Sequence, residues 1–259
     1  TDNSTENKRG IDHFFESTTT PAYVTQFLIT AVLSPDYRDI TGDGISDDDI
    51  GNYVKFNYYK EGFNYRWRTP FEQNKASYNR GLRSDEADDK GSYVYGEKEL
   101  WYVHSVESKT EIAMFYYSKR NDGFGVKGEN GGIDTDMYLR KLDSIVVYSK
   151  PERILKNELA TPLKRYYFNY DYELCQNTYN AKSETNGKLT LKEVATTFEK
   201  SQKGKMTPYS FEYGKVNENL IVNPNYSLRD VNRWGYYQKN NGYSDCDDGS
   251  PLSNLDFPY

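Results

Sequence analysis

Alternation of apolar and polar residues is clearest in Asn52-Tyr53-Val54-Lys55-Phe56-Asn57-Tyr58-Tyr59-Lys60. A period of two is typical of a β-strand that packs one face on a core, because successive side chains point to opposite sides. A second such run follows, Phe63-Asn64-Tyr65-Arg66-Trp67-Arg68, and Lys60-Glu61-Gly62 between the runs predicts a tight connection. The sequence therefore predicts two adjacent strands joined by a short turn.

The same alternation continues on both sides of this region. Residues 22–33 (AYVTQFLITAVL) predict one long strand that ends at Pro35. Further along, three similar units each pair an apolar-x-x-apolar strand with a returning strand, and they start about 40–50 residues apart, a spacing typical of repeat architectures. The units are Val103-His104-Ser105-Val106 with Phe115-Tyr116-Tyr117, Leu142-Asp143-Ser144-Ile145 with Phe168-Asn169-Tyr170, and Leu191-Lys192-Glu193-Val194 with Phe211-Glu212-Tyr213.

These patterns predict an all-β fold in which repeated antiparallel hairpins form a large continuous or curved sheet. Chance recurrence in a tyrosine-rich β protein is the alternative explanation for the repeats. We expect a polar, disordered leader at residues 1–20, a hairpin domain at 21–240 and an irregular polar tail at 241–259. Glycine-rich segments at 121–125 and 128–132 predict mobile loops, and residues 151–159 are the one candidate helix.

Composition narrows the classes of function. The chain has 26 Tyr and 12 Phe, so tyrosine takes over much of the burial that Leu and Ile usually provide. A net charge of −6 argues against a nucleic-acid partner, because phosphate binding requires a basic surface. No apolar run approaches the ~20 residues that a transmembrane helix needs. Cys175 and Cys246 either form one long-range disulfide or remain two free thiols.

Catalytic motifs are scarce. The chain has two histidines, His13 and His104, and it lacks a nucleophile elbow, a zinc-protease motif and a phosphate-binding loop. Paired carboxylates for glycoside hydrolysis stay open, because the fold decides which acids pair. The sequence therefore favours a non-catalytic protein.

A candidate calcium loop spans residues 39–49 (DITGDGISDDD). Oxygen donors alternate along it, and glycine after the third donor lets the chain wrap around an ion that takes six to eight oxygens. The predicted metal ligands are Asp39, Thr41, Asp43, the Ile45 carbonyl, Asp47 and Asp49. Position twelve is Ile50 in place of the glutamate of an EF-hand. An acidic surface turn without metal is the alternative.

Aromatic side chains offer a second candidate site. Trp234, Tyr236 and Tyr237 lie in a turn-like setting and could stack on sugar rings. Trp67 and Trp101 are better explained as core or cross-strand partners within their hairpins.

One family resemblance emerges from the hairpin sequences. Lys188-Leu189-Thr190-Leu191-Lys192-Glu193-Val194 with Pro208-Tyr209-Ser210-Phe211-Glu212-Tyr213 resembles the hairpins of Rhs/YD-repeat proteins and toxin-complex shells. Together with Asp43-Gly44-Ile45-Ser46-Asp47 and Asn232-Arg233-Trp234-Gly235-Tyr236, the pattern is similar to very large exported proteins of Bacteroidetes-type bacteria. The resemblance implies stacked hairpins in a hollow shell or surface array, without catalytic residues.

The sequence thus predicts a calcium-stabilised, non-catalytic structural or interaction segment of a large bacterial protein that is secreted or associated with the outer membrane. Its expected partners are the remainder of its own polypeptide and a surface polysaccharide or another secreted protein. A carbohydrate-binding module, or a fragment of a polysaccharide-active enzyme that uses exposed aromatics, is the alternative. A third hypothesis, part of a toxin-encapsulating shell, requires further hairpins beyond Tyr259.

Overall fold

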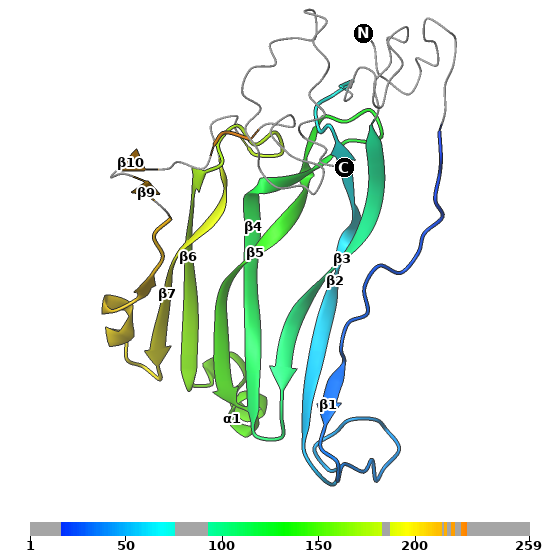
Figure 1. The fold of residues 1–259 in the computed structure, drawn as a ribbon. Coiled ribbons are helices and arrows are strands. Elements are labelled where there is room, and N and C mark those ends of the chain that lie inside the picture. The colour runs from blue at the N-terminus through cyan, green and yellow to red at the C-terminus, as the bar shows by residue number, and fades with distance from the viewer. Residues whose placement is uncertain are drawn as a thin grey trace, which may run out of the picture.

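The computed structural model describes residues 17–75, 93–182, 187–213, 215–216, 219–220 and 224–226. Eight antiparallel strands form one open sheet, in which each strand pairs with the next along the chain (Figure 1). They are β1 (Ala31–Leu33), β2 (Tyr53–Thr69), β3 (Val94–Glu107), β4 (Glu111–Val126), β5 (Ile133–Ser149), β6 (Lys164–Leu174), β7 (Lys188–Phe198) and β8 (Tyr209–Ser210). A separate pair comprises β9 (Lys215–Val216) and β10 (Asn219–Leu220). The predicted all-β sheet of antiparallel hairpins is confirmed.

Three long hairpins, β2–β3, β4–β5 and β6–β7, make up most of the sheet, and in each the first strand ends and the second begins at the upper end in Figure 1. Neighbouring hairpins share only short ladders: residues 105–107 pair with 112–114, and residues 144–147 pair with 164–167. Backbone pairing therefore joins the hairpins near the lower end, and side chains make the contacts between them further up.

Tyrosines occupy the region between the β2–β3 and β4–β5 hairpins. The ring centroids of Tyr59 and Tyr102 lie 5.7 Å apart, and those of Tyr102 and Tyr117 lie 5.3 Å apart. The Tyr117 hydroxyl donates to the Val103 carbonyl at 3.0 Å. Rings that pack while their hydroxyls bond the backbone explain how a tyrosine-rich chain builds a core with few aliphatic residues.

The upper end of β4 is buried on both sides. Residues 122–126 are all buried, and Phe124 and Val126 are 2% and 0% exposed. A Cβ at Gly125 would lie 2.8 Å from the Arg66 carbonyl oxygen on β2. The prediction of a mobile loop at 121–125 is therefore wrong: its glycines allow strands to approach closely instead of forming a turn.

The predicted turn at residues 60–62 is also wrong, because β2 continues through it as one strand. Three β2 residues, Glu61 to Phe63, lie opposite the single β3 residue Leu100, so the ladder shifts register there. An irregularity of this kind bends and twists a strand without ending it. The alternation of apolar and polar residues is the same before and after residues 60–62, so the sequence predicts two strands where the structure has one.

The long strand predicted at residues 22–33 is largely absent, since only Ala31–Leu33 pairs with β2. The Phe56 amide still donates to the Thr30 carbonyl, and the chain from residue 17 to residue 30 is exposed. Figure 1 shows this blue segment leaving the sheet above β1. Directly after Phe56, between Asn57 and Tyr58, the pairing of β2 with β3 shifts register. Residues 22–30 do not form a ladder with this part of β2.

The candidate helix is confirmed. α1 spans Lys150–Lys156 with Pro151 in its first turn, and a 3₁₀ turn, η1, follows at Asn157–Leu159. Proline suits this position because the first amides of a helix have no intrahelical acceptor. The segment covers a small core at the lower end of β4 and β5, formed by Val146, Tyr148 and Ala160. A second 3₁₀ turn, η2, spans Lys203–Met206.

Several predictions lie partly outside the described residues. Most of the leader (1–16) and the whole tail (241–259) lie outside, as do His13 and Cys246. Residues 128–132 form the turn between β4 and β5. In the third unit, residues 211–213 follow β8 and do not belong to it. Equivalence of the three units as repeats stays a prediction. Within the described ranges, no helix is long and apolar enough to cross a membrane.

Candidate functional site

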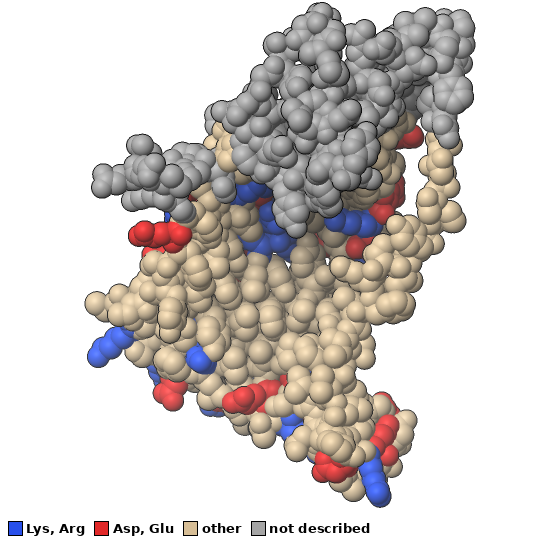
Figure 2. Space-filling model, viewed as in Figure 1, with Lys and Arg blue, Asp and Glu red and all other residues tan. Residues whose placement is uncertain are grey.

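The acidic loop, residues 39–49, connects β1 to β2 at the lower end of the sheet, where Figure 2 shows its acidic side chains. Asp39 accepts hydrogen bonds from the amides of Gly42 at 2.6 Å and Gly44 at 3.0 Å. Both glycines have positive φ, +73° and +95°, a conformation that other residues adopt at a cost. The alternating Asp/Gly pattern thus folds the loop around the Asp39 carboxylate.

Asp49 closes the loop from its buried end. Its side chain is 3% exposed and accepts from the Tyr37 hydroxyl, the Ile40 amide at 3.2 Å and the Ser46 amide at 2.9 Å. The Tyr37 hydrogen bond is the largest cause that holds the pKa of Asp49 below its usual value. The same bond raises the pKa of Tyr37. Asp49 therefore holds the loop together in its ionised, carboxylate form.

Lys150 ties this loop to three other elements. Its ammonium group donates to Asp47 at 2.7 Å and to the Tyr53 hydroxyl at 2.9 Å. It also forms an ion pair with Glu107 of β3 at 3.0 Å. Burial alone would raise the pKa of Asp47 and Glu107, but their hydrogen bonds outweigh it and hold both pKa values low. The network joins α1, β2, β3 and the loop.

Each of the six predicted calcium-ligand residues takes part in a hydrogen bond within this arrangement. The Ile45 carbonyl accepts from Lys55 at 3.1 Å, and Asp43 accepts from the Thr41 hydroxyl at 2.8 Å. In the described part of the chain, no group of three or more His, Cys, Asp or Glu side chains is placed to hold a metal ion. A calcium ion bound in this loop would therefore compete with the protein groups that already donate hydrogen bonds to these oxygens.

The predicted aromatic site, Trp234, Tyr236 and Tyr237, lies outside the described residues. Trp67 pairs with Gly96 across the β2–β3 ladder, and its ring lies so close that a Cβ at Gly96 would come within 2.8 Å. Trp67 nevertheless remains 37% exposed, and Trp101 is 48% exposed. Each tryptophan therefore combines a cross-strand position with an exposed ring surface.

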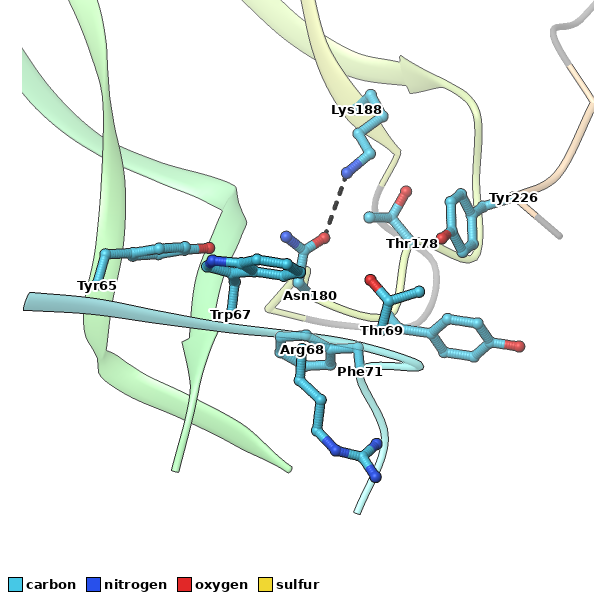
Figure 3. A pocket seen from close by; sticks show the side chains of 10 residues that line it. Tyr65, Trp67, Arg68, Thr69, Phe71, Thr178, Asn180, Lys188 and Tyr226 are labelled. Carbon is cyan, nitrogen blue, oxygen red and sulfur yellow. Dashed lines mark hydrogen bonds between the residues drawn. The ribbon is translucent and has the colours of Figure 1, made fainter. Parts of the chain in front are cut away.

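A cavity of about 210 Å³ lies at the upper end of the sheet (Figure 3). Three regions far apart in sequence form it: the end of β2, the β6–β7 loop with the start of β7, and residue 226. The lining residues are Tyr65, Trp67, Arg68, Thr69, Phe71, Thr178, Tyr179, Asn180, Lys188 and Tyr226. Tyr179 and Tyr226 meet edge to face, with ring centroids 5.6 Å apart. Five of the ten lining residues are thus aromatic.

Hydrogen bonds hold the polar side of this cavity in place. The Phe124 amide donates to the Asn180 carbonyl at 3.0 Å, which fixes the loop after β6 on the end of β4. Tyr65, 4% exposed, donates to the Phe124 carbonyl at 3.0 Å, and burial raises its pKa to about 12. Sequence reasoning missed this site, because its side chains come from separate segments with no shared motif.

Other residues singled out in the sequence do not join this cavity. His104 is exposed on β3, with its Nδ1 3.3 Å from the Ser105 hydroxyl. Cys175 forms no disulfide with a described residue, and burial raises the pKa of its thiol. On the face of the molecule that Figure 2 shows, Lys and Arg side chains gather in a hollow, and the middle of that face is nearly free of charged side chains.

No protein-family model, curated protein or solved structure matches this chain.

Proposed function

We propose that this chain is a non-catalytic structural and interaction segment of a large bacterial protein that is secreted or displayed on the cell surface. In this proposal residues 17–30 form a strand with neighbouring β-structure supplied by the remainder of the same polypeptide. The observation that carries it is the state of that segment: it is exposed, Figure 1 draws it extended, and its one backbone bond to the sheet among the described residues is at Thr30, which accepts from the Phe56 amide.

The composition of the segment supports pairing. No charged residue occurs between Glu16 and Asp36, although charged residues make up 28% of the chain. Phe27 is 93% exposed and Tyr23 is 73% exposed. Exposed strands normally carry charges or proline that prevent pairing, so an uncharged apolar strand is a template for another sheet. Apolar residues on both faces of the segment fit a strand that is covered on both sides.

Calcium is a separate part of the proposal. An ion in the acidic loop would stabilise the connection between β1 and β2, and it would do so only where free calcium is abundant, as outside the cell. The alternating donors of residues 39–49 support it, and the hydrogen bonds that engage those donors count against it.

Self-association of the chain tests the strand proposal. We expect sedimentation velocity to show concentration-dependent association, because the unpaired segment has no other partner in a purified sample. Hydrogen exchange at residues 22–30 should slow as association increases. Phe27→Lys should suppress both effects, whereas Leu155→Lys, which changes an 80% exposed residue on α1, should not. A monomer at every concentration, with fast exchange in the segment, would reject the proposal.

The cavity supports carbohydrate binding as a second candidate function. Aromatic rings pack on the apolar faces of sugars, and amide and hydroxyl groups bond their hydroxyls. Trp67, Asn180 and Lys188 bring both kinds of group to one cavity. Retention of the wild-type chain on a glycan array, with loss of retention in Trp67→Ala, is the expected result. Equal retention of wild type and variant would show that any glycan binding occurs outside this cavity.

A further inference from the structure

The cavity is positively charged by its lining. Its ten lining residues include two cations, Arg68 and Lys188, and no Asp or Glu. Figure 3 shows that Arg68 points away from the other side chains, while Lys188 points toward Asn180. The Arg68 guanidinium is instead engaged by carbonyl groups, including that of Glu129 at 2.7 Å. Lys188 is thus the lining cation that faces the cavity.

Lys188 has no carboxylate at ion-pair distance among the described residues. Its ammonium group donates a hydrogen bond to the Asn180 side-chain oxygen at 3.3 Å. The nearby Asp122 is already occupied, since it accepts two bonds from Arg120, at 2.9 and 2.7 Å, and one from the Leu189 amide at 2.9 Å. Burial lowers the pKa of Lys188 and outweighs the attraction of Asp122, which acts in the opposite direction.

The opposite wall of the cavity is aromatic. Figure 3 shows the rings of Tyr65 and Trp67 beside the Asn180 amide, facing the side from which Lys188 enters. Tyr65 is buried, whereas Trp67 keeps 37% of its surface exposed. An accessible indole next to an amide and an ammonium group combines a stacking surface, a hydrogen-bonding group and a positive charge within one small cavity.

The size of the cavity limits the ligand. A volume of about 210 Å³ lies below the ~300 Å³ at which drug-sized ligand pockets begin, so a single ring fits better than an extended chain. A ligand that uses all three groups therefore has one ring with a stackable face, hydroxyls for the amide and an anion for the ammonium group.

We propose that this cavity binds one carboxylate-bearing sugar residue of the uronic acid type, with its carboxylate on Lys188, its ring against Trp67 and a hydroxyl on Asn180. This inference rests on the carbohydrate-binding candidate function and names its ligand class. The charge-assisted bond to Lys188 would supply the selection for acidic over neutral sugars.

Calorimetric titration with four probes tests the inference: glucuronic acid, glucose, acetate and inorganic phosphate. We expect glucuronic acid to bind about tenfold more tightly than glucose, because glucose lacks the charge-assisted hydrogen bond to Lys188. It should also bind more tightly than acetate and phosphate, because these anions have no ring to pack on Trp67. Lys188→Met should remove the preference over glucose, and Lys188→Arg should keep it. Lys192→Met is the matched control on the same strand, because Lys192 is already paired with Glu173. Trp67→Ala should weaken glucuronic acid and glucose alike.

The outcomes separate this inference from the function on which it rests. Equal binding of glucuronic acid and glucose would overturn the acidic ligand class and leave carbohydrate binding standing. Acetate or phosphate as strong as glucuronic acid would show a simple anion site and overturn the sugar. No binding of any probe to wild type would overturn both. Melting curves of the variants establish that each is folded before its titration is interpreted.

Discussion

Glu61 on β2 accepts two hydrogen bonds from Arg140 on β5, at 2.7 and 3.1 Å, although these strands are not neighbours in the sheet. Glu61 is 6% exposed and lies in the register shift of β2. The shift therefore turns a carboxylate toward the next hairpin, and the ion pair joins the hairpins where no backbone ladder does.

Breaking this pair should be costly. Glu61→Ala leaves a half-buried guanidinium without its partner, so we expect a loss of about 2–4 kcal/mol in the free energy of unfolding. Chemical denaturation of Glu61→Ala, Arg140→Ala and the double variant measures the coupling. Glu99→Ala breaks the exposed pair with Lys60 and should cost about 1 kcal/mol or less. Equal losses for Glu61→Ala and Glu99→Ala would contradict the role of the buried pair.

Acid should destabilise the lower end of the sheet. Asp47 and Glu107 have pKa values below their usual range, because hydrogen bonds, foremost those from Lys150 to Asp47 and from Asn57 to Glu107, outweigh burial. A carboxylate with a lowered pKa stabilises the folded state above its unfolded pKa, and this contribution is lost as pH falls through the folded pKa. Stability should thus fall from about pH 5 downward.

Melting temperatures between pH 7 and pH 3 measure this loss. Lys150→Met should flatten the decline, since both carboxylates lose their shared cation. A decline of unchanged steepness in Lys150→Met would show that the acid response arises elsewhere in the chain.

Gly125 should tolerate no side chain. A Cβ there would lie 2.8 Å from the Arg66 carbonyl oxygen and 2.9 Å from the Met137 Cβ, so backbone or core must shift. We expect Gly125→Ala to cost about 1–3 kcal/mol in denaturant unfolding. Gly62 is the control within β2, because nothing lies within 4 Å of an added Cβ, and Gly62→Ala should be neutral or slightly stabilising. Similar behaviour of the two variants would contradict the packing of β4 on β2.

The antiparallel sheet and α1 could be predicted because they depend on local pattern: a period of two along the strands, and Pro151 at a helix start. The predictions that were wrong concern features that depend on neighbouring strands. Glu61-Gly62 resembles a turn, and so does Asn121-Asp122-Gly123, since sequence does not reveal a register shift or a close strand approach. The alternation in residues 22–33 indicates that this segment can pair as a β-strand, but it does not identify the strand with which it pairs.

The cavity around Lys188 could not be predicted for the same reason. Its side chains come from β2, from the β6–β7 loop with the start of β7, and from residue 226, and these three regions are far apart in sequence. Trp67 was assigned to cross-strand packing, which the ladder with Gly96 supports, yet its exposed surface also lines the cavity. Strand alternation predicts which face a residue occupies, but not which distant loop covers that face.

The calcium proposal for the acidic loop predicts that millimolar calcium raises the melting temperature and that EDTA returns it to the metal-free value, because a ligand of the folded state stabilises it by mass action. Asp43→Ala, which removes one predicted ligand whose side chain accepts from the exposed Thr41 hydroxyl, should reduce that shift with little effect on the metal-free midpoint. Asp39→Asn should lower the midpoint even without calcium, because Asp39 also holds the Gly42 and Gly44 amides. An identical midpoint in calcium and in EDTA would reject the metal and leave a loop held by hydrogen bonds alone.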